Sequence, residues 1–302
     1  MKWTLVILAL VVTFFFEEFY RYMICRNSSR LFEKLFDSKG HEPEYYIYRE
    51  KGKEKMESLE QDVFTIQSAR GQNLKGFYYS NGSRGKVIAF CVHGYRSDHA
   101  DTGGICYDYY KSRGIDFFCC DHTAHGQSEG HFIGFDVLES EDCLLWLNFL
   151  IKKFGPDVQI ILHGFSMGGA TVMQMSSRCP KNVKFIVEDS GFSNARASLA
   201  HQIGPLYQSL WFLNRIIAGY NLDKSDVRVS LAQSRLPILF VHGQDDKLVP
   251  YEIGPMLYED YEGPKDCFFP ENTRHIESMY TQPEAYAAKL DEFCKKYLAR
   301  ED

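Results

Sequence analysis

Five short runs of mostly apolar residues recur along the chain, and each ends at a glycine or an aspartate. The runs lie at residues 86–94, 115–121, 158–164, 183–189 and 237–243. Strands that are buried on both faces have this continuous apolar pattern, because helices cover both sides of a parallel sheet. We therefore predict that these runs form the parallel strands of one sheet.

The segments between these runs have apolar residues at helical spacing. Residues 138–154 carry an apolar stripe, with acids near the start and lysines near the end, and residues 281–298 form a second amphipathic pattern. Two strand-like runs, at 62–69 and 74–80, precede the alternation and are separated by turn residues. This order predicts an α/β protein whose mostly parallel sheet has an antiparallel edge.

One stretch interrupts the alternation. Residues 192–235 contain no strand-like run and are too many for a simple loop. We predict that they form inserted helices that cap the sheet. Their aromatic and aliphatic side chains, concentrated at 206–220, would partly pack on the sheet and partly line an acyl pocket.

The N-terminal segment is the only candidate for contact with a membrane. Residues 3–16 are apolar, and a helix over 3–24 would be long enough to span if Glu17, Glu18 and Arg21 lie at the interface. We predict an uncleaved transmembrane anchor. A cleaved signal peptide that exports the protein is the alternative, although no small-x-small cleavage site follows. More basic residues follow the apolar run than precede it, which favours a cytoplasmic location for the body.

The predicted division is an anchor at 1–25, a charged linker at 26–61 and an α/β domain at 62–302, with the cap at about 192–235. The chain has 302 residues, of which 34 are basic and 40 are acidic, so its net charge is −6. Proteins that bind nucleic acid usually carry an excess of basic residues, so this charge excludes nucleic-acid binding of that kind. The nine cysteines form no CxxC pair and show no zinc spacing with histidine. We expect small buried side chains in a reducing compartment, and no cofactor or metal.

The strongest chemical signal is the sequence Gly164-Phe165-Ser166-Met167-Gly168. Ser166 follows a predicted strand and precedes a predicted helix, which is the context that exposes a nucleophilic hydroxyl at the sheet edge. The same pattern recurs around Ser128, but no strand comes directly before it and no helix directly after. We therefore predict that Ser166 is a nucleophile and that Ser128 is a loop serine.

A serine hydroxyl needs a base and an acid that orients the base. His275 lies before the final predicted helix, and Asp246 follows the strand-like run at 237–243. Taken singly, each would be a surface or turn residue, but the order of all three is that of a catalytic triad on an α/β sheet. The expected oxyanion donors are the backbone amides of Met167 and Tyr95.

Two other histidines, His93 and His242, precede glycines at strand ends, and we expect structural roles for them.

Several motifs in this order resemble the α/β-hydrolase superfamily. They are HGYRSD, DHTAHGQSEG, HGFSMGG, EDSGFSN, HGQDDKLVP and RHIES, and the resemblance covers about residues 62–302. More narrowly, the chain is similar to bacterial membrane-anchored hydrolases with serine aminopeptidase-like or bile-acid acyltransferase-like domains. The resemblance implies an eight-stranded sheet with helices on both faces and an acid at Asp246, with Asp245 as the fallback. Thr123 and Asn272 stand where relatives often have arginine and glycine.

The expected function is hydrolysis of carboxylic esters with small or medium acyl groups by a serine hydrolase. A serine peptidase or acyltransferase on the same triad is the alternative, and a membrane-anchored module that binds a ligand without turnover is a third. Glu188 and Asp189 lie at the end of the predicted strand 183–189, beside the expected active-site edge, and leave an exopeptidase open, because either could hold a substrate amine. The natural substrate and the oligomeric state do not follow from the sequence.

Overall fold

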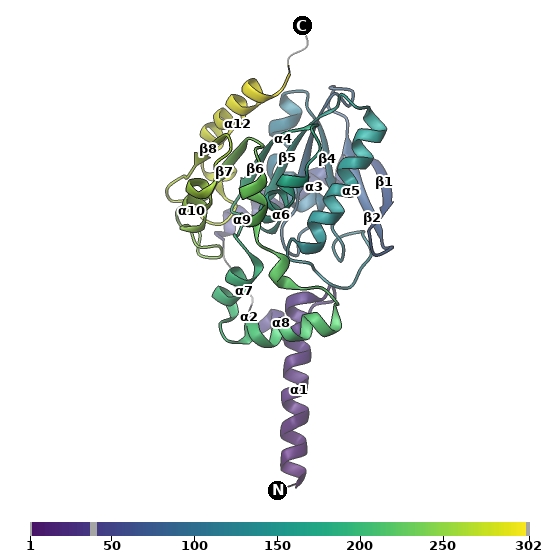
Figure 1. Ribbon diagram of the computed structural model, residues 1–302, viewed down its shortest axis with the longest axis vertical. Coiled ribbons are helices and arrows are strands. Elements are labelled where there is room, and N and C mark those ends of the chain that lie inside the picture. The colour runs from purple at the N-terminus through teal and green to yellow at the C-terminus, as the bar shows by residue number, and fades with distance from the viewer. Residues whose placement is uncertain (1, 37–40, 300–302) are drawn as a thin grey trace.

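The computed structural model describes residues 2–36 and 41–299, and its centre is an eight-stranded sheet (Figure 1). The strand order is β1-β2-β4-β3-β5-β6-β7-β8; β2 pairs antiparallel with β1 and β4, and β3 to β8 run parallel. The strands are β1 Asp62–Gln67, β2 Asn73–Tyr79, β3 Val87–Val92, β4 Asp116–Cys120, β5 Gln159–Phe165, β6 Val183–Asp189, β7 Ile238–Val241 and β8 Lys265–Phe268. The predicted α/β fold with an antiparallel edge is confirmed.

Helices cover both faces of this sheet, and alternate strand residues serve the two layers (Figure 1). On β3, Phe90 joins the core under α5 and α6, whereas its neighbour Cys91 joins the core under α4 and α12. The sheet helices are α4 His99–Ser112, α5 Val137–Phe154, α6 Met167–Met175, α10 Ile253–Asp260, α11 Ser278–Thr281 and α12 Pro283–Tyr297, with a 3-10 turn η1 at Ser176–Arg178. Both faces of the central strands are therefore buried, as the continuous apolar runs predict.

Residues 192–235 form helices and no strand. They comprise α7 Ala195–Ile203, α8 Leu206–Ile217, the 3-10 turn η2 Leu222–Lys224 and α9 Val227–Gln233. The apolar residues of α8 are divided between two environments: Tyr207 and Leu210 are buried, whereas Phe212 and Ile216 are exposed. This segment thus contributes both to the core and to the surface.

The N-terminal helix α1, Lys2–Ile24, extends away from the body and joins it through its C-terminal end (Figure 1). Among residues 2–36 and 41–299, no helix has the length and apolar character needed to cross a membrane, so the predicted transmembrane helix is not supported. In α1, the charged residues Glu17, Glu18 and Arg21 lie where the apolar stretch would have to continue in order to cross a membrane. Instead, Phe19 and Ile24 are buried in the domain core.

The segment predicted as a linker contains more structure than its charge pattern suggests. It includes α2 Arg30–Phe36 and α3 Pro43–Ser58, and α3 packs against α4. The two helices approach so closely that a Cβ on Gly104 would lie 2.4 Å from the carbonyl carbon of Gly52. Charged residues cover the exposed side of α3, while Tyr45 and Met56 are fully buried on its other side. The few buried positions are too widely spaced for the sequence to show an apolar stripe.

Candidate active site

Ser166 lies at a sharp turn between β5 and α6. Its φ of +55° is in the left-handed region, where a residue other than glycine is strained. Two glycines make this turn possible: a Cβ on Gly164 would lie 2.2 Å from the carbonyl oxygen of Gly168, and a Cβ on Gly168 would lie 2.0 Å from that of Val92. The Ser166 amide also donates to the Asp189 carbonyl at 2.8 Å. The turn therefore holds the serine at the carboxyl edge of the sheet.

The structure brings Ser166, His275 and Asp246 into one hydrogen-bonded line. His275 Nε2 lies 2.8 Å from Ser166 Oγ, and His275 Nδ1 lies 2.7 Å from Asp246 Oδ2. His275 and Asp246 are buried, at 5% and 4% exposure. Since the carboxylate accepts from Nδ1–H, Nε2 is left with the lone pair that can accept the serine proton.

The Asp246 carboxylate is held by several donors. Its Oδ1 accepts from the amides of Leu248 and Val249, at 2.9 and 3.0 Å. Burial raises the pKa of Asp246, but interactions with His275 and His242 outweigh burial and lower the pKa below the ordinary 3.8. Asp246 is therefore ionised at neutral pH. Asp245, the fallback acid, is exposed and does not occupy this position.

The loop that carries His275 is held by two hydrogen bonds at the next residue, Ile276. The Ile276 amide donates to Ser190 Oγ at 3.2 Å, and its carbonyl accepts from the Tyr45 hydroxyl at 2.6 Å. Asn272 adopts φ +53°, a conformation that glycine adopts freely and that asparagine tolerates better than most other residues. The contribution of Tyr45 was missed at the sequence level, because it comes from a segment predicted to be a linker.

The two expected oxyanion donors lie on either side of the serine. Met167 is the first residue of α6, so its amide is among those without an intrahelical partner. Tyr95 follows Gly94, whose Cβ, if present, would lie 3.3 Å from Ser166 Cβ. The two segments meet because β3 and β5 pair up to their ends, with Val92 opposite Gly164. Both amides therefore belong to backbone next to the serine.

The side chains of Tyr95 and Arg96 hold the end of α1. The Tyr95 hydroxyl lies 2.9 Å from the Met23 carbonyl oxygen and 3.1 Å from that of Tyr22. Arg96 Nη2 donates to the Tyr22 and Cys25 carbonyls, at 2.5 and 3.0 Å. Arginine at the last carbonyls of a helix interacts favourably with the helix dipole. No sequence signal links α1 to this loop.

The remaining candidate histidines have structural partners. His93 Nδ1 contacts the Gly94 carbonyl at 2.8 Å, and burial lowers the pKa of His93. His242 Nε2 lies 2.9 Å from the Val249 carbonyl and 3.3 Å from Asp246 Oδ2. The geometry agrees with the prediction that neither is the base.

Ser128 is also held within the fold. Its hydroxyl donates to the Asp121 carbonyl at 2.6 Å and accepts from the Lys75 amide at 2.8 Å. It is buried in the loop after β4. Of the two GxSxG sequences, only the one around Ser166 carries its serine next to a histidine and an acid.

Glu188 and Asp189 are fully buried at the end of β6. Glu188 Oε2 accepts from the Gly191 amide at 3.0 Å, and Asp189 accepts from the hydroxyls of Ser190 and Tyr286. Burial raises the pKa of Glu188 to about 8 and that of Asp189 to about 6. Neither carboxyl is positioned to meet the terminal amine of a substrate.

Comparison with known families and curated proteins finds a matching family and several similar proteins. Residues 83–230 match the model of a family described as "Serine aminopeptidase, S33". An uncharacterized protein, YqkD, of Bacillus subtilis is 26% identical over 249 residues, which cover 80% of this chain and 81% of that protein. Mouse monoglyceride lipase is 31% identical over 184 residues, 56% of this chain and 55% of that enzyme.

Solved structures show the same architecture. The Pyrococcus furiosus esterase Pf2001 matches with a TM-score of 0.66 and 20% identity, over 80% of this chain and 92% of that one. Est1E of Butyrivibrio proteoclasticus, solved with ferulic acid, matches with a TM-score of 0.61 and 17% identity, over 78% of this chain and 100% of that one. At these identities the likeness concerns the fold.

Proposed function

We propose that this chain, which has an α/β-hydrolase fold and matches the serine aminopeptidase S33 family over residues 83–230, is a serine hydrolase that cleaves carboxylic esters. The observation that carries this proposal is the line from Ser166 through His275 to Asp246, with heavy-atom distances of 2.8 and 2.7 Å. These distances fall within the range for a nucleophile, its base and the group that orients the base. Sequence order, local structure and geometry all favour the same three residues.

In the proposed reaction, Ser166 Oγ attacks the ester carbonyl carbon as His275 Nε2 takes its proton. The carbonyl oxygen becomes negatively charged and is stabilised by the amides of Met167 and Tyr95. The imidazolium then gives the proton to the leaving alcohol, and an acyl-serine remains. Water, deprotonated by the same imidazole, attacks the acyl-serine, and the acid leaves as the imidazolium returns the proton to Ser166 Oγ. Asp246 keeps its charge throughout and stabilises the imidazolium.

An ester substrate is favoured over a peptide with a free amino terminus. An aminopeptidase needs a negative group beside the bound amine, and the two carboxyls that could serve, Glu188 and Asp189, are buried and hydrogen-bonded. Relatives and neighbours include proteins named as an esterase and a monoglyceride lipase, which supports an ester substrate by analogy.

The surface between α1 and α8 is suited to an apolar partner. Side chains of the two helices line a groove of about 450 Å³, among them Val12, Phe16, Phe212 and Ile217. We include in the proposal that a lipid surface contacts this part of the molecule, because Trp3 is 80% exposed and the outer face of α1 is apolar. Co-sedimentation of the full chain with phosphatidylcholine vesicles would test this part independently of catalysis.

The experiment compares the full chain with Ser166→Ala on 4-nitrophenyl esters of increasing acyl length and on aminoacyl anilides. Ester turnover that disappears in the alanine variant is expected, together with labelling of Ser166 by a fluorophosphonate. Turnover of anilides alone would identify a peptidase. A folded wild-type chain that neither labels nor turns over either series would contradict the proposal.

A further inference from the structure

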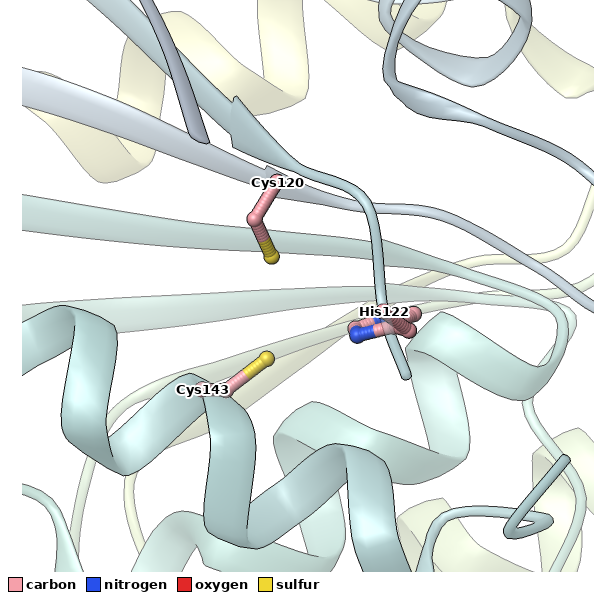
Figure 2. Close-up of side chains that lie close together, drawn as sticks. All are labelled: Cys120, His122 and Cys143. Carbon is pink, nitrogen blue, oxygen red and sulfur yellow. The ribbon is translucent and has the colours of Figure 1, made fainter. Parts of the chain in front are cut away.

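Three metal-binding side chains meet inside the domain, apart from the proposed triad. Cys120 ends β4, His122 lies two residues further on, and Cys143 comes from the facing side of α5 (Figure 2). Their sulfur and nitrogen ligand atoms all lie within 4.8 Å of one another. All three side chains are fully buried. The loop after β4 and helix α5 thus bring a nitrogen ligand and two sulfur ligands to one point.

The imidazole of His122 is unusual because neither ring nitrogen has a hydrogen-bond partner among the described residues. The hydrogen bonds of His122 are made by its backbone: the amide donates to His93 Nε2 at 3.0 Å, and the carbonyl accepts from the His125 amide at 3.0 Å. A buried polar group without a partner costs about 1–3 kcal/mol, so such groups call for an explanation. Figure 2 shows the ring beside the two sulfur atoms. The cluster therefore contains a buried ligand that lacks a partner.

We propose that Cys120, His122 and Cys143 form a zinc-binding site. Zinc prefers sulfur and imidazole nitrogen, and three protein ligands leave a fourth position for another group. On binding, each thiol loses its proton to solvent as its Zn–S bond forms, and the oxidation states of zinc and sulfur do not change. Two thiolates and a neutral imidazole balance the charge of Zn²⁺, which suits an apolar interior.

The location gives the site a structural role. The rings of His122 and His93 lie with their centroids 4.2 Å apart, and His93 directly precedes the loop of Gly94 and Tyr95. A zinc ion that joins the loop after β4 to α5 would therefore brace the backbone from which one expected oxyanion donor comes. Because Ser166 and His275 are not among the ligands, the metal has no part in the proposed acyl transfer.

A second cysteine pair in the same domain provides a matched control. Cys106 Sγ lies 3.8 Å from Cys91 Sγ, and both are buried, but no histidine joins them in a three-ligand group in the described part of the chain. If close thiols alone were enough, this pair would bind zinc as well.

The test is the metal content of the full chain, expressed without a polyhistidine tag in zinc-supplemented medium and dialysed against EDTA. About one zinc per chain is expected for the wild type and for Cys106→Ala. Less than a tenth of that is expected for Cys143→Ala and for His122→Gln. A folded wild-type chain without zinc, or Cys143→Ala with undiminished zinc, would overturn the proposal.

A second measurement does not depend on how the variants fold. Wild-type chain produced in cobalt-supplemented, zinc-free medium should show thiolate-to-cobalt charge-transfer absorption and the visible bands of tetrahedral Co²⁺. Bound cobalt without the thiolate absorption would place the metal elsewhere and refute the assignment.

Discussion

Replacement of Gly168 by alanine is the sharpest test of how the serine turn is built. Gly168 is the second residue of α6 and lies two residues after Ser166 in the chain. A Cβ at this position would lie 2.0 Å from the carbonyl oxygen of Val92 and 2.8 Å from that of His93. Both obstacles are backbone atoms at the end of β3, so no side chain can rotate away to make room.

The size of the disturbance follows from these distances. A Cβ contact below 3.0 Å is essentially never found, so α6 and the end of β3 must separate by about 1 Å. That separation moves Ser166 relative to the loop of Gly94 and Tyr95. A displacement of about 1 Å in a reacting group can cost about 100-fold in rate, or about 3 kcal/mol of barrier. Overpacking also costs about 1–3 kcal/mol of stability.

The assay is kcat and KM on the best 4-nitrophenyl ester, with folded fraction measured by circular dichroism on the same samples. Gly169→Ala is the matched control, because its Cβ would meet nothing closer than 3.1 Å, at Gly191 Cα. We expect Gly169→Ala to keep most of the activity and Gly168→Ala to lose about 100-fold in kcat per folded molecule. A folded Gly168→Ala variant with wild-type kcat would show that contact between α6 and β3 does not position the serine.

Three further changes test other parts of the molecule. Asp246→Asn should lower kcat about 10⁴-fold, because an amide does not keep the His275 imidazole in the correct tautomer; a loss below tenfold in the steady-state assay would contradict this role. Glu188→Gln should remove a pH-dependent loss of stability: the folded-state pKa of about 8 lies above the ordinary 4.5, so wild-type stability falls as pH rises from about 4.5 to about 8, by at most about 5 kcal/mol, and urea unfolding should show the variant gaining on the wild type at pH 6 and gaining about 3 kcal/mol more at pH 9. Arg96→Ala should cost about 2 kcal/mol and speed amide hydrogen exchange at the end of α1, including Tyr22; unchanged exchange there would show that the arginine does not hold the helix.

The sheet and the three aligned residues could be predicted from sequence because their signals are local. Continuous apolar runs mark the central strands, and the glycines around Ser166 mark the turn. His275 and Asp246 could be selected because the order of strands brings loops that are distant in sequence to one edge. In each case, the residue and its neighbours in the chain carry the information.

The features that sequence did not predict depend on long-range contacts between weak local patterns. Helix α3 is polar along most of its length, and only Tyr45 and Met56 are fully buried. Cys120, His122 and Cys143 lack the paired spacing of common zinc motifs, because one ligand comes from α5 and the others from the end of β4. The end of α1 contributes Phe19 and Ile24 to the core, and Tyr95 and Arg96 bind its last carbonyls.

The attachment of α1 has a consequence for any manipulation of the chain end. Tyr95 and Arg96 grip the final turn of a 23-residue helix whose other end extends away from the body (Figure 1). A rigid helix that is held at one end transmits a force on its free end to the residues that hold it. Here those residues lie in the loop beside Ser166. Tethering the free end of α1 to a bead or resin therefore applies load to the catalytic edge of the sheet. A deletion up to Cys25 would instead remove Phe19 and Ile24 from the core and leave Tyr95 and Arg96 without these carbonyl partners, which makes internal loops far from this edge better places for a label.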